Sequence, residues 1–86
     1  MISQGENMQD RIRKILVSHG KMSTDAMSVS STVDLYELGL TSHASVNVML
    51  ALEDEFDIEF PDSDLKKSTF ATVENLETVV GRLAPA

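Results

Sequence analysis

Residues 41–56 read TSHASVNVMLALEDEF, and the spacing of their apolar side chains predicts the clearest helix of the chain. Gly39 ends the loop that precedes this helix, and either Thr41 or Ser42 can cap its amino end. One face of the helix fits a hydrophobic core and is made of Ser45, Val48, Met49, Leu52 and Phe56. The chain is therefore expected to fold around this helix.

Two further apolar residues of the same helix, Val46 and Leu50, lie four positions apart on a neighbouring face. They can extend the core, or they can form a surface that meets a partner protein. The apolar pattern alone favours the core for both residues.

The sequence before this helix predicts another helix and a long loop. Residues 8–20 carry apolar side chains at helical spacing together with His19, and Gly20 stands where a helix would end. Residues 21–41 are rich in Ser, Thr and Asp, with scattered apolar residues that can still reach the core. A loop of this length in so small a domain is usually functional.

The sequence after it predicts two more elements. Residues 57–61 alternate polar and apolar side chains, but a lone strand would have nothing to pair with, so we expect an extended loop. Pro61 opens a short acidic turn or helix over residues 62–67, and Thr72 can cap a last helix. The apolar face of that helix consists of Val73, Leu76, Val80 and Leu83. The expected fold is all-α, with three main helices and a short one.

Length and charge limit the possible partners. The chain has 86 residues, enough for one core but not for two. Its 14 acidic and seven basic residues give a net charge of -7, which disfavours nucleic acid and anionic membranes as partners and favours basic proteins. There is no cysteine, so any thiol chemistry must use an attached group. We expect a monomer.

The amino-terminal residues 1–7 are polar and contain a glycine, so we expect them to be disordered and the folded domain to occupy residues 8–83. They lack the basic and apolar pattern of a signal peptide, and no apolar run has the length of a transmembrane helix. A cytoplasmic location is the resulting expectation.

Catalysis and metal binding are both poorly supported. His43 directly follows Ser42, and consecutive helical residues point about 100° apart, so the two cannot form a nucleophile and base pair by themselves. Acidic residues are dense over residues 53–64, but no glycine lies where a calcium-binding loop requires one. We expect no catalytic residue and no metal site, and we interpret the acidic stretch as a solvated surface that speeds the approach of basic enzymes.

Ser42 is the candidate for a covalently attached group. A serine at a helix start is most often a plain cap. However, the free backbone N–H groups and the positive dipole end of a helix favour a phosphate group at this position. Ser42 is thus physically suited to carry a phosphate-linked group.

Two segments, DLYELGLTS at residues 34–42 and LEDEFDIEFP at residues 52–61, resemble the acyl carrier protein family. In that family a Leu-Gly loop leads to a serine at the start of the second helix, and an acidic helix end is followed by a sequence like Phe-Asp-Ile-Glu-Phe-Pro. The spacing from Ser42 to Pro61 fits without a gap, and the resemblance covers most of the chain.

The resemblance implies a four-helix bundle in which a phosphopantetheinyl transferase joins 4′-phosphopantetheine from coenzyme A to Ser42. The arm would supply the missing thiol and hold an acyl group as a thioester for partner enzymes. Val46 and Leu50 match family positions that touch such enzymes, which reverses the preference for the core. The residues that the resemblance implies as partner contacts are Thr41, His43, Val46, Asn47, Leu50, Glu53 and Asp54.

The residues around Ser42 depart from the fatty-acid carriers. Those proteins usually have Asp-Ser-Leu around the serine and more acids in the next turns, whereas residues 41–47 here contain no acid. Enzymes that recognise charge beside the serine should therefore bind this chain poorly.

The run GLTSHASV at residues 39–46 is more similar to the stand-alone bacterial aminoacyl carrier proteins. In those proteins a ligase similar to a seryl-tRNA synthetase catalytic domain loads a small amino acid, such as glycine or alanine, which a downstream enzyme then accepts. A specialised fatty-acyl or polyketide carrier is the alternative within the family. An unmodified acidic helical interaction module is the alternative outside it.

Overall fold

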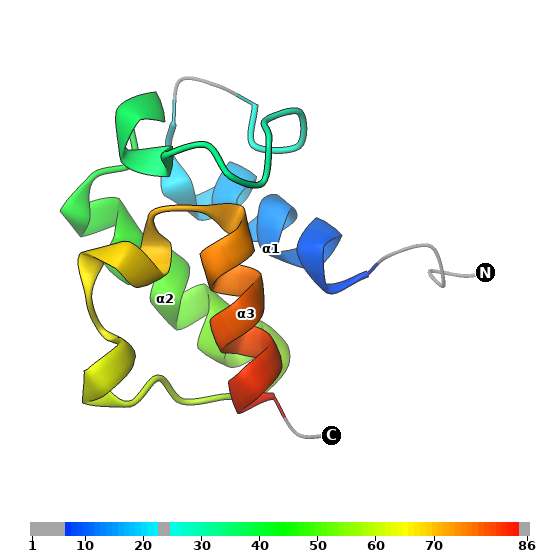
Figure 1. Cartoon of the computed structure of the whole chain (residues 1–86), viewed down its shortest axis with the longest axis vertical. Coiled ribbons are helices and arrows are strands. Elements are labelled where there is room, and N and C mark those ends of the chain that lie inside the picture. The colour runs from blue at the N-terminus through cyan, green and yellow to red at the C-terminus, as the bar shows by residue number, and fades with distance from the viewer. Residues whose placement is uncertain (1–6, 23–24, 85–86) are drawn as a thin grey trace.

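Three α-helices form the framework of the computed structural model, which describes residues 7–22 and 25–84 (Figure 1). The helices are α1 (Met8–Ile15), α2 (Ser42–Phe56) and α3 (Val73–Leu83), and a π-helical turn, η2 (Leu16–Gly20), continues α1. Three 3₁₀ turns complete the helical structure: η3 (Leu35–Leu38), η4 (Asp62–Asp64) and η5 (Lys67–Phe70). No strand occurs in the described ranges, and the all-α prediction is confirmed.

The short acidic turn or helix predicted over residues 62–67 corresponds to two separate 3₁₀ turns, η4 and the start of η5. Residues 62–67 do not make one helix, because Leu65 (φ -87°, ψ 68°) and Lys66 (φ -139°, ψ 160°) have non-helical backbones and separate η4 from η5. Asp64 turns inward at this point and accepts a hydrogen bond from Arg82 Nη2 at 2.8 Å. The predicted set of four helices is therefore three α-helices with 3₁₀ turns between α2 and α3.

The first helix begins and ends near the predicted residues. The side chain of Asn7 accepts a hydrogen bond from Asp10 N, which caps α1; residues 1–6 of the predicted disordered segment lie outside the described part. The helix ends at Gly20 as predicted, but the left-handed conformation falls on Lys21 (φ 54°) and Gly20 is buried. His19, which shares the apolar spacing of this helix, is exposed.

Aliphatic side chains from all three helices form the core, and Ile12, Val48, Leu52 and Leu76 have no exposed surface. The long loop adds Leu35 and Leu40, and η5 adds Phe70. Most residues of the predicted faces of α2 and α3 are buried, but Ser45, Met49 and Leu83 are only partly buried. Ala44, which was not assigned to the predicted face of α2, is buried in the core.

The long loop, residues 25–41, lies at the upper end of the helices in Figure 1. Hydrogen bonds connect it to the rest of the protein. The guanidinium of buried Arg13 donates to two loop carbonyl oxygens, those of Ala26 at 2.9 Å and Val29 at 2.6 Å. Farther along, Leu35 N donates to the carbonyl oxygen of Ala71 at 2.7 Å, just before α3. The loop that leads to α2 is thus fixed to α1 and to the start of α3.

Candidate functional site

Ser42 is the first residue of α2 but not its cap. The cap is Thr41, whose hydroxyl oxygen accepts a hydrogen bond from Ala44 N at 3.0 Å. Ser42 is exposed, and its own hydroxyl makes no hydrogen bond within the described ranges. Because Thr41 satisfies the helix end, the Ser42 hydroxyl is available for a reaction.

The surroundings of Ser42 favour a negatively charged group. The first turn of α2 contains no acidic residue, and the amino end of a 15-residue helix carries a partial positive charge. The backbone of this turn is also fixed, since Ser45 Oγ donates a hydrogen bond to the carbonyl oxygen of Ser42 at 2.7 Å.

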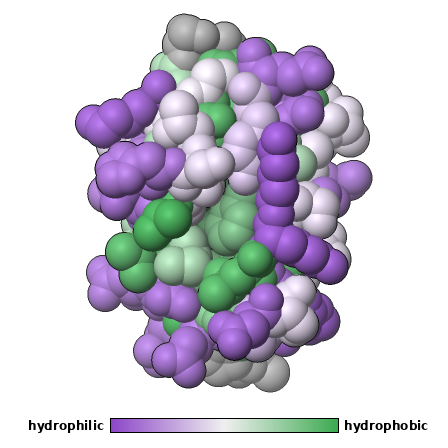
Figure 2. Space-filling model, turned by 90° about the vertical axis from the view of Figure 1, so that its left-hand side faces the viewer, coloured by the Kyte–Doolittle hydropathy of each residue, from purple (hydrophilic) through white to green (hydrophobic). Residues whose placement is uncertain are grey.

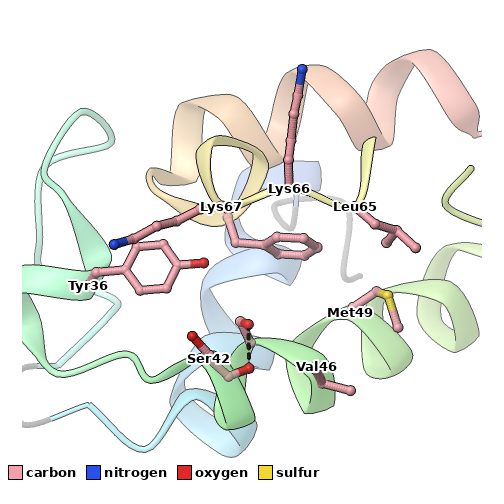
Figure 3. A pocket seen from close by; sticks show the side chains of 9 residues that line it. Tyr36, Ser42, Val46, Met49, Leu65, Lys66 and Lys67 are labelled. Carbon is pink, nitrogen blue, oxygen red and sulfur yellow. Dashed lines mark hydrogen bonds between the residues drawn. The ribbon is translucent and has the colours of Figure 1, made fainter. Parts of the chain in front are cut away.

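A groove of about 400 Å³ opens beside Ser42, between α2 and the segment that carries η5 (Figure 3). Its volume falls within the range of about 300–1,000 Å³ that is common for small-molecule sites. The lining is mainly apolar and aromatic: Tyr36, Ser42, Ser45, Val46, Met49, Leu65, Lys66, Lys67 and Phe70. On the face shown in Figure 2, apolar side chains gather around a hollow and hydrophilic ones surround them.

Tyr36 closes one end of this groove and is only partly buried. Burial raises its pKa above the usual 10.0, the nearby Asp34 carboxylate raises it further, and a hydrogen bond with the Ser45 side chain opposes both effects. Tyr36 is therefore a neutral phenol at physiological pH, and through Ser45 it contacts the turn that carries Ser42.

Lys67 lies across the groove from Ser42, with its ammonium nitrogen 4.9 Å from the centre of the Tyr36 ring (Figure 3). Its neighbour Lys66 points away from the groove in the same view. Two lysines and no carboxylate thus line this groove, on a chain with twice as many acidic as basic residues.

The structure exposes most of the residues predicted as partner contacts. Val46 and Leu50 are 51% and 53% exposed, so the pattern-based preference for the core is wrong for both and the preference drawn from the resemblance fits. Thr41, His43 and Asp54 are exposed as well, and Val46 also lines the groove beside Ser42. Three of these residues follow Ser42 along one side of α2 at intervals of four: Val46, Leu50 and Asp54.

Two predicted contact residues are less accessible. Asn47 is half-buried, and so is Glu53, whose Oε2 accepts a hydrogen bond from Phe60 N at 2.9 Å. Glu53 thus has a structural role that the sequence did not indicate, because it fixes the loop that follows α2. A change at Glu53 would test the fold together with the surface, whereas Asp54 tests the surface alone.

The sequence prediction missed the far wall of the groove, which Tyr36, Leu65, Lys67 and Phe70 form. Tyr36 is the only tyrosine of the chain and lies just before Ser42, which could have marked it. No spacing rule pairs it with Lys67, which is 31 positions away, since this contact depends on how η5 folds back over α2.

The part of the chain that the structure describes contains no candidate membrane span and no candidate metal centre. None of its helices has the length and apolar content needed to cross a bilayer. No three His, Asp or Glu side chains there converge to hold a metal ion.

Comparison with known families gives one match that covers most of the chain. Residues 10–80 match the family described as a phosphopantetheine attachment site. The chain is also 42% identical over 73 residues to an aminoacyl carrier protein of Agrobacterium fabrum, and the match covers 85% of this chain and 88% of that protein.

Two solved structures are similar in fold. The first is a crystal structure of an engineered Bradyrhizobium japonicum glycine:[carrier protein] ligase with a carrier protein from Agrobacterium tumefaciens and AMP. The matched chain has a TM-score of 0.83 and 42% identity, over 86% of this chain and 99% of that one. The second is a Bradyrhizobium japonicum glycine:[carrier protein] ligase with glycylated carrier protein, with a TM-score of 0.70 and 32% identity, over 85% and 99%.

Proposed function

Because this chain belongs to the phosphopantetheine-attachment family of carrier proteins, we propose that Ser42 is the residue that bears its 4′-phosphopantetheine arm. The observation that carries this assignment is the position of Ser42, which is exposed at the head of α2 while Thr41 caps the helix. The groove of about 400 Å³ beside it supports the same assignment, since it offers space for a flexible arm.

The protein is a carrier and not a catalyst. The Ser42 hydroxyl gives up its proton and takes the phosphopantetheinyl group from coenzyme A, and adenosine 3′,5′-bisphosphate leaves. The bound arm supplies the thiol, which the chain itself lacks, to hold an aminoacyl group as a thioester. The residues of the chain present Ser42 at a fixed helix end and leave its first turn free of acids.

The protein is an aminoacyl carrier whose partners are a phosphopantetheinyl transferase and a ligase of the glycine:[carrier protein] type. We propose glycine or alanine as the amino acid. The glycylated carrier protein bound to the Bradyrhizobium ligase supports a small amino acid. The absence of acids around Ser42 supports an enzyme set different from that of fatty-acid carriers.

For the ligase contact we propose the exposed side of α2 that begins at Ser42 and continues through Val46, Leu50 and Asp54. Half-exposed apolar side chains are suitable for the centre of an interface, and the acidic end of α2 can attract a basic partner. Thr41 and His43 flank the serine, while Asn47 and Glu53 contribute from the edge of this surface.

Three broader features complete the proposal. The carrier domain occupies residues 8–83 as a monomer in the cytoplasm. Residues 62–70 act as the third element of a four-helix bundle, although they consist of two 3₁₀ turns. Their place between α2 and α3 and their contribution to the groove support this role.

Intact-mass analysis tests the assignment. Incubation with coenzyme A and a phosphopantetheinyl transferase should add one phosphopantetheine group to the wild type and none to Ser42→Ala, with Ser45→Ala as the control that is still modified. The modified protein is then incubated with ATP, the ligase and a panel of amino acids. A hydroxylamine-labile glycyl or alanyl adduct is expected, and loading by fatty acids alone would contradict the aminoacyl function.

A further inference from the structure

The groove beside Ser42 has a charge opposite to that of the protein as a whole. The chain carries a net charge of -7, yet the groove lining includes two lysines and no carboxylate. On the Tyr36 side, the Asp34 carboxylate already accepts a hydrogen bond from Tyr36 N at 2.9 Å. A negatively charged group on Ser42 would therefore meet no carboxylate in the lining of this groove.

Of the two lysines, Lys67 lies at the Tyr36 end of the groove, whereas Lys66 points away from the groove (Figure 3). The Lys67 ammonium lies against the Tyr36 ring at 4.9 Å, at the end of the groove where Ser42 also lies (Figure 3). Within the described ranges Lys67 has no carboxylate partner, whereas Arg11 and Arg82 are paired with Glu55 and Asp64. An aromatic ring orients a cation without neutralising its charge, so Lys67 keeps a full positive charge beside the groove.

We propose that Lys67, held by Tyr36, binds the phosphodiester that links the arm to Ser42 and so directs the arm along the groove. This inference rests on the proposed attachment at Ser42. A lysine ammonium is a compact charge that binds phosphate oxygens without the planar geometry that arginine requires. Contact with the Tyr36 ring restricts the lysine before the phosphodiester arrives, which lowers the entropic cost of ordering it.

The remaining lining continues the path of the arm away from Ser42. Met49 from α2 lies opposite Leu65 (Figure 3), and Val46 also belongs to the lining of the groove. These apolar side chains can pack against the gem-dimethyl part of pantetheine. Lys67 would then fix the charged end of the arm while the apolar walls cover the segment that follows it.

The experiment uses the full chain with the arm attached, and the degree of modification is first verified by intact mass. The variants are Lys67→Met, which keeps the aliphatic stem and removes the charge, and Lys66→Met as a matched control with the neighbouring charge removed. Lys67→Arg restores the charge. The ³¹P NMR shift of the phosphodiester is recorded at about 10 mM and about 1 M salt, where the Debye length is about 30 Å and about 3 Å.

Wild type, Lys66→Met and Lys67→Arg should each show a ³¹P resonance that moves between low and high salt. In Lys67→Met the resonance should lie near the high-salt position at both salt concentrations. At low salt, attachment of the arm should raise the melting midpoint of the wild type, Lys66→Met and Lys67→Arg. In Lys67→Met, attachment should not raise the melting midpoint.

A fully modified Lys67→Met protein with the wild-type resonance and salt response would overturn the proposal. An equal loss of the salt response in Lys66→Met would also overturn the proposal. The response would then depend on the net positive charge near the groove and not on Lys67 itself. Failure of the attachment itself gives a different result: no mass increase in the wild type, or an increase that persists in Ser42→Ala.

Discussion

Arg13 offers the sharpest test of how the loop before Ser42 is held. Its residue surface is only 8% exposed, and its guanidinium donates to the carbonyl oxygens of Ala26 and Val29 and to Gln9 Oε1. Replacement by Met keeps a long apolar side chain in the site but leaves both loop carbonyls without this donor. The change therefore isolates the hydrogen bonds from the packing.

The size of the effect follows from these contacts. A hydrogen bond to a charged group contributes about 1.5–3 kcal/mol, and part of this gain offsets the cost of burying the guanidinium. Loss of the two carbonyl contacts should therefore lower the free energy of unfolding by about 3 kcal/mol. For a domain of this size that corresponds to a fall in melting midpoint of roughly 12–24 °C.

Urea denaturation followed by circular dichroism measures this loss. The matched control is Arg11→Met, on the same helix, which removes a surface ion pair with Glu55 (2.8 Å) and a contact with the Phe56 ring. The control should lose about 1 kcal/mol or less. Equal losses in the two variants would refute the reasoning, because the burial of Arg13 would then have no energetic consequence.

Three further changes test the site. Thr41→Ala removes the cap of α2 and should cost about 1 kcal/mol by denaturation, while modification of Ser42 still proceeds; no loss would show that the cap does not stabilise the helix. Val46→Ser and Leu50→Ser should leave the melting midpoint nearly unchanged and weaken binding of the ligase, measured by titration calorimetry; unchanged affinity would place the interface elsewhere. Tyr36 has a raised pKa, so its ionisation favours unfolding: stability should fall as pH rises above about 10, and Tyr36→Phe should remove that part of the fall.

Helices α2 and α3 were predictable because their signals are local. Thr41 and Thr72 each cap a helix through a hydrogen bond to a backbone N–H three residues ahead, and apolar side chains follow at helical spacing. The core faces of both helices could be assigned from that spacing. The exposure of Val46 and Leu50 could not be assigned from the spacing. When a helix has apolar residues on two faces, its sequence does not show which face the other elements of the fold cover.

The form of residues 62–70 depends on contacts that are distant in sequence. Asp64 binds Arg82, which lies 18 positions later, and this contact turns a residue of an acidic stretch into the protein. Phe70 is buried and packs against Phe60 with ring centres 5.7 Å apart. These long-range contacts favour two tight turns over one continuous helix. They cannot be predicted from the spacing of apolar residues within the segment.

The same distinction explains why the sequence could single out Ser42 as a candidate but could not predict the groove. A serine at a helix start is a local feature, and its meaning is set by its immediate neighbours. The groove joins the 3₁₀ turn before α2 to the one before α3, so its cation and its aromatic ring come from segments that only the fold brings together.

The distribution of charge along α2 links the site to the choice of partners. The serine end has no acid in its first turn and lines the same groove as Lys67, whereas the far end carries Glu53, Asp54 and Glu55. An acidic far end speeds the approach of a basic enzyme, and this steering needs no acid beside the arm. Acids next to Ser42 would repel the phosphodiester and compete with it for Lys67. The acidic end of α2 and the proposed attachment site at Ser42 are thus separate, so attraction to basic partners does not place a carboxylate beside the proposed phosphodiester.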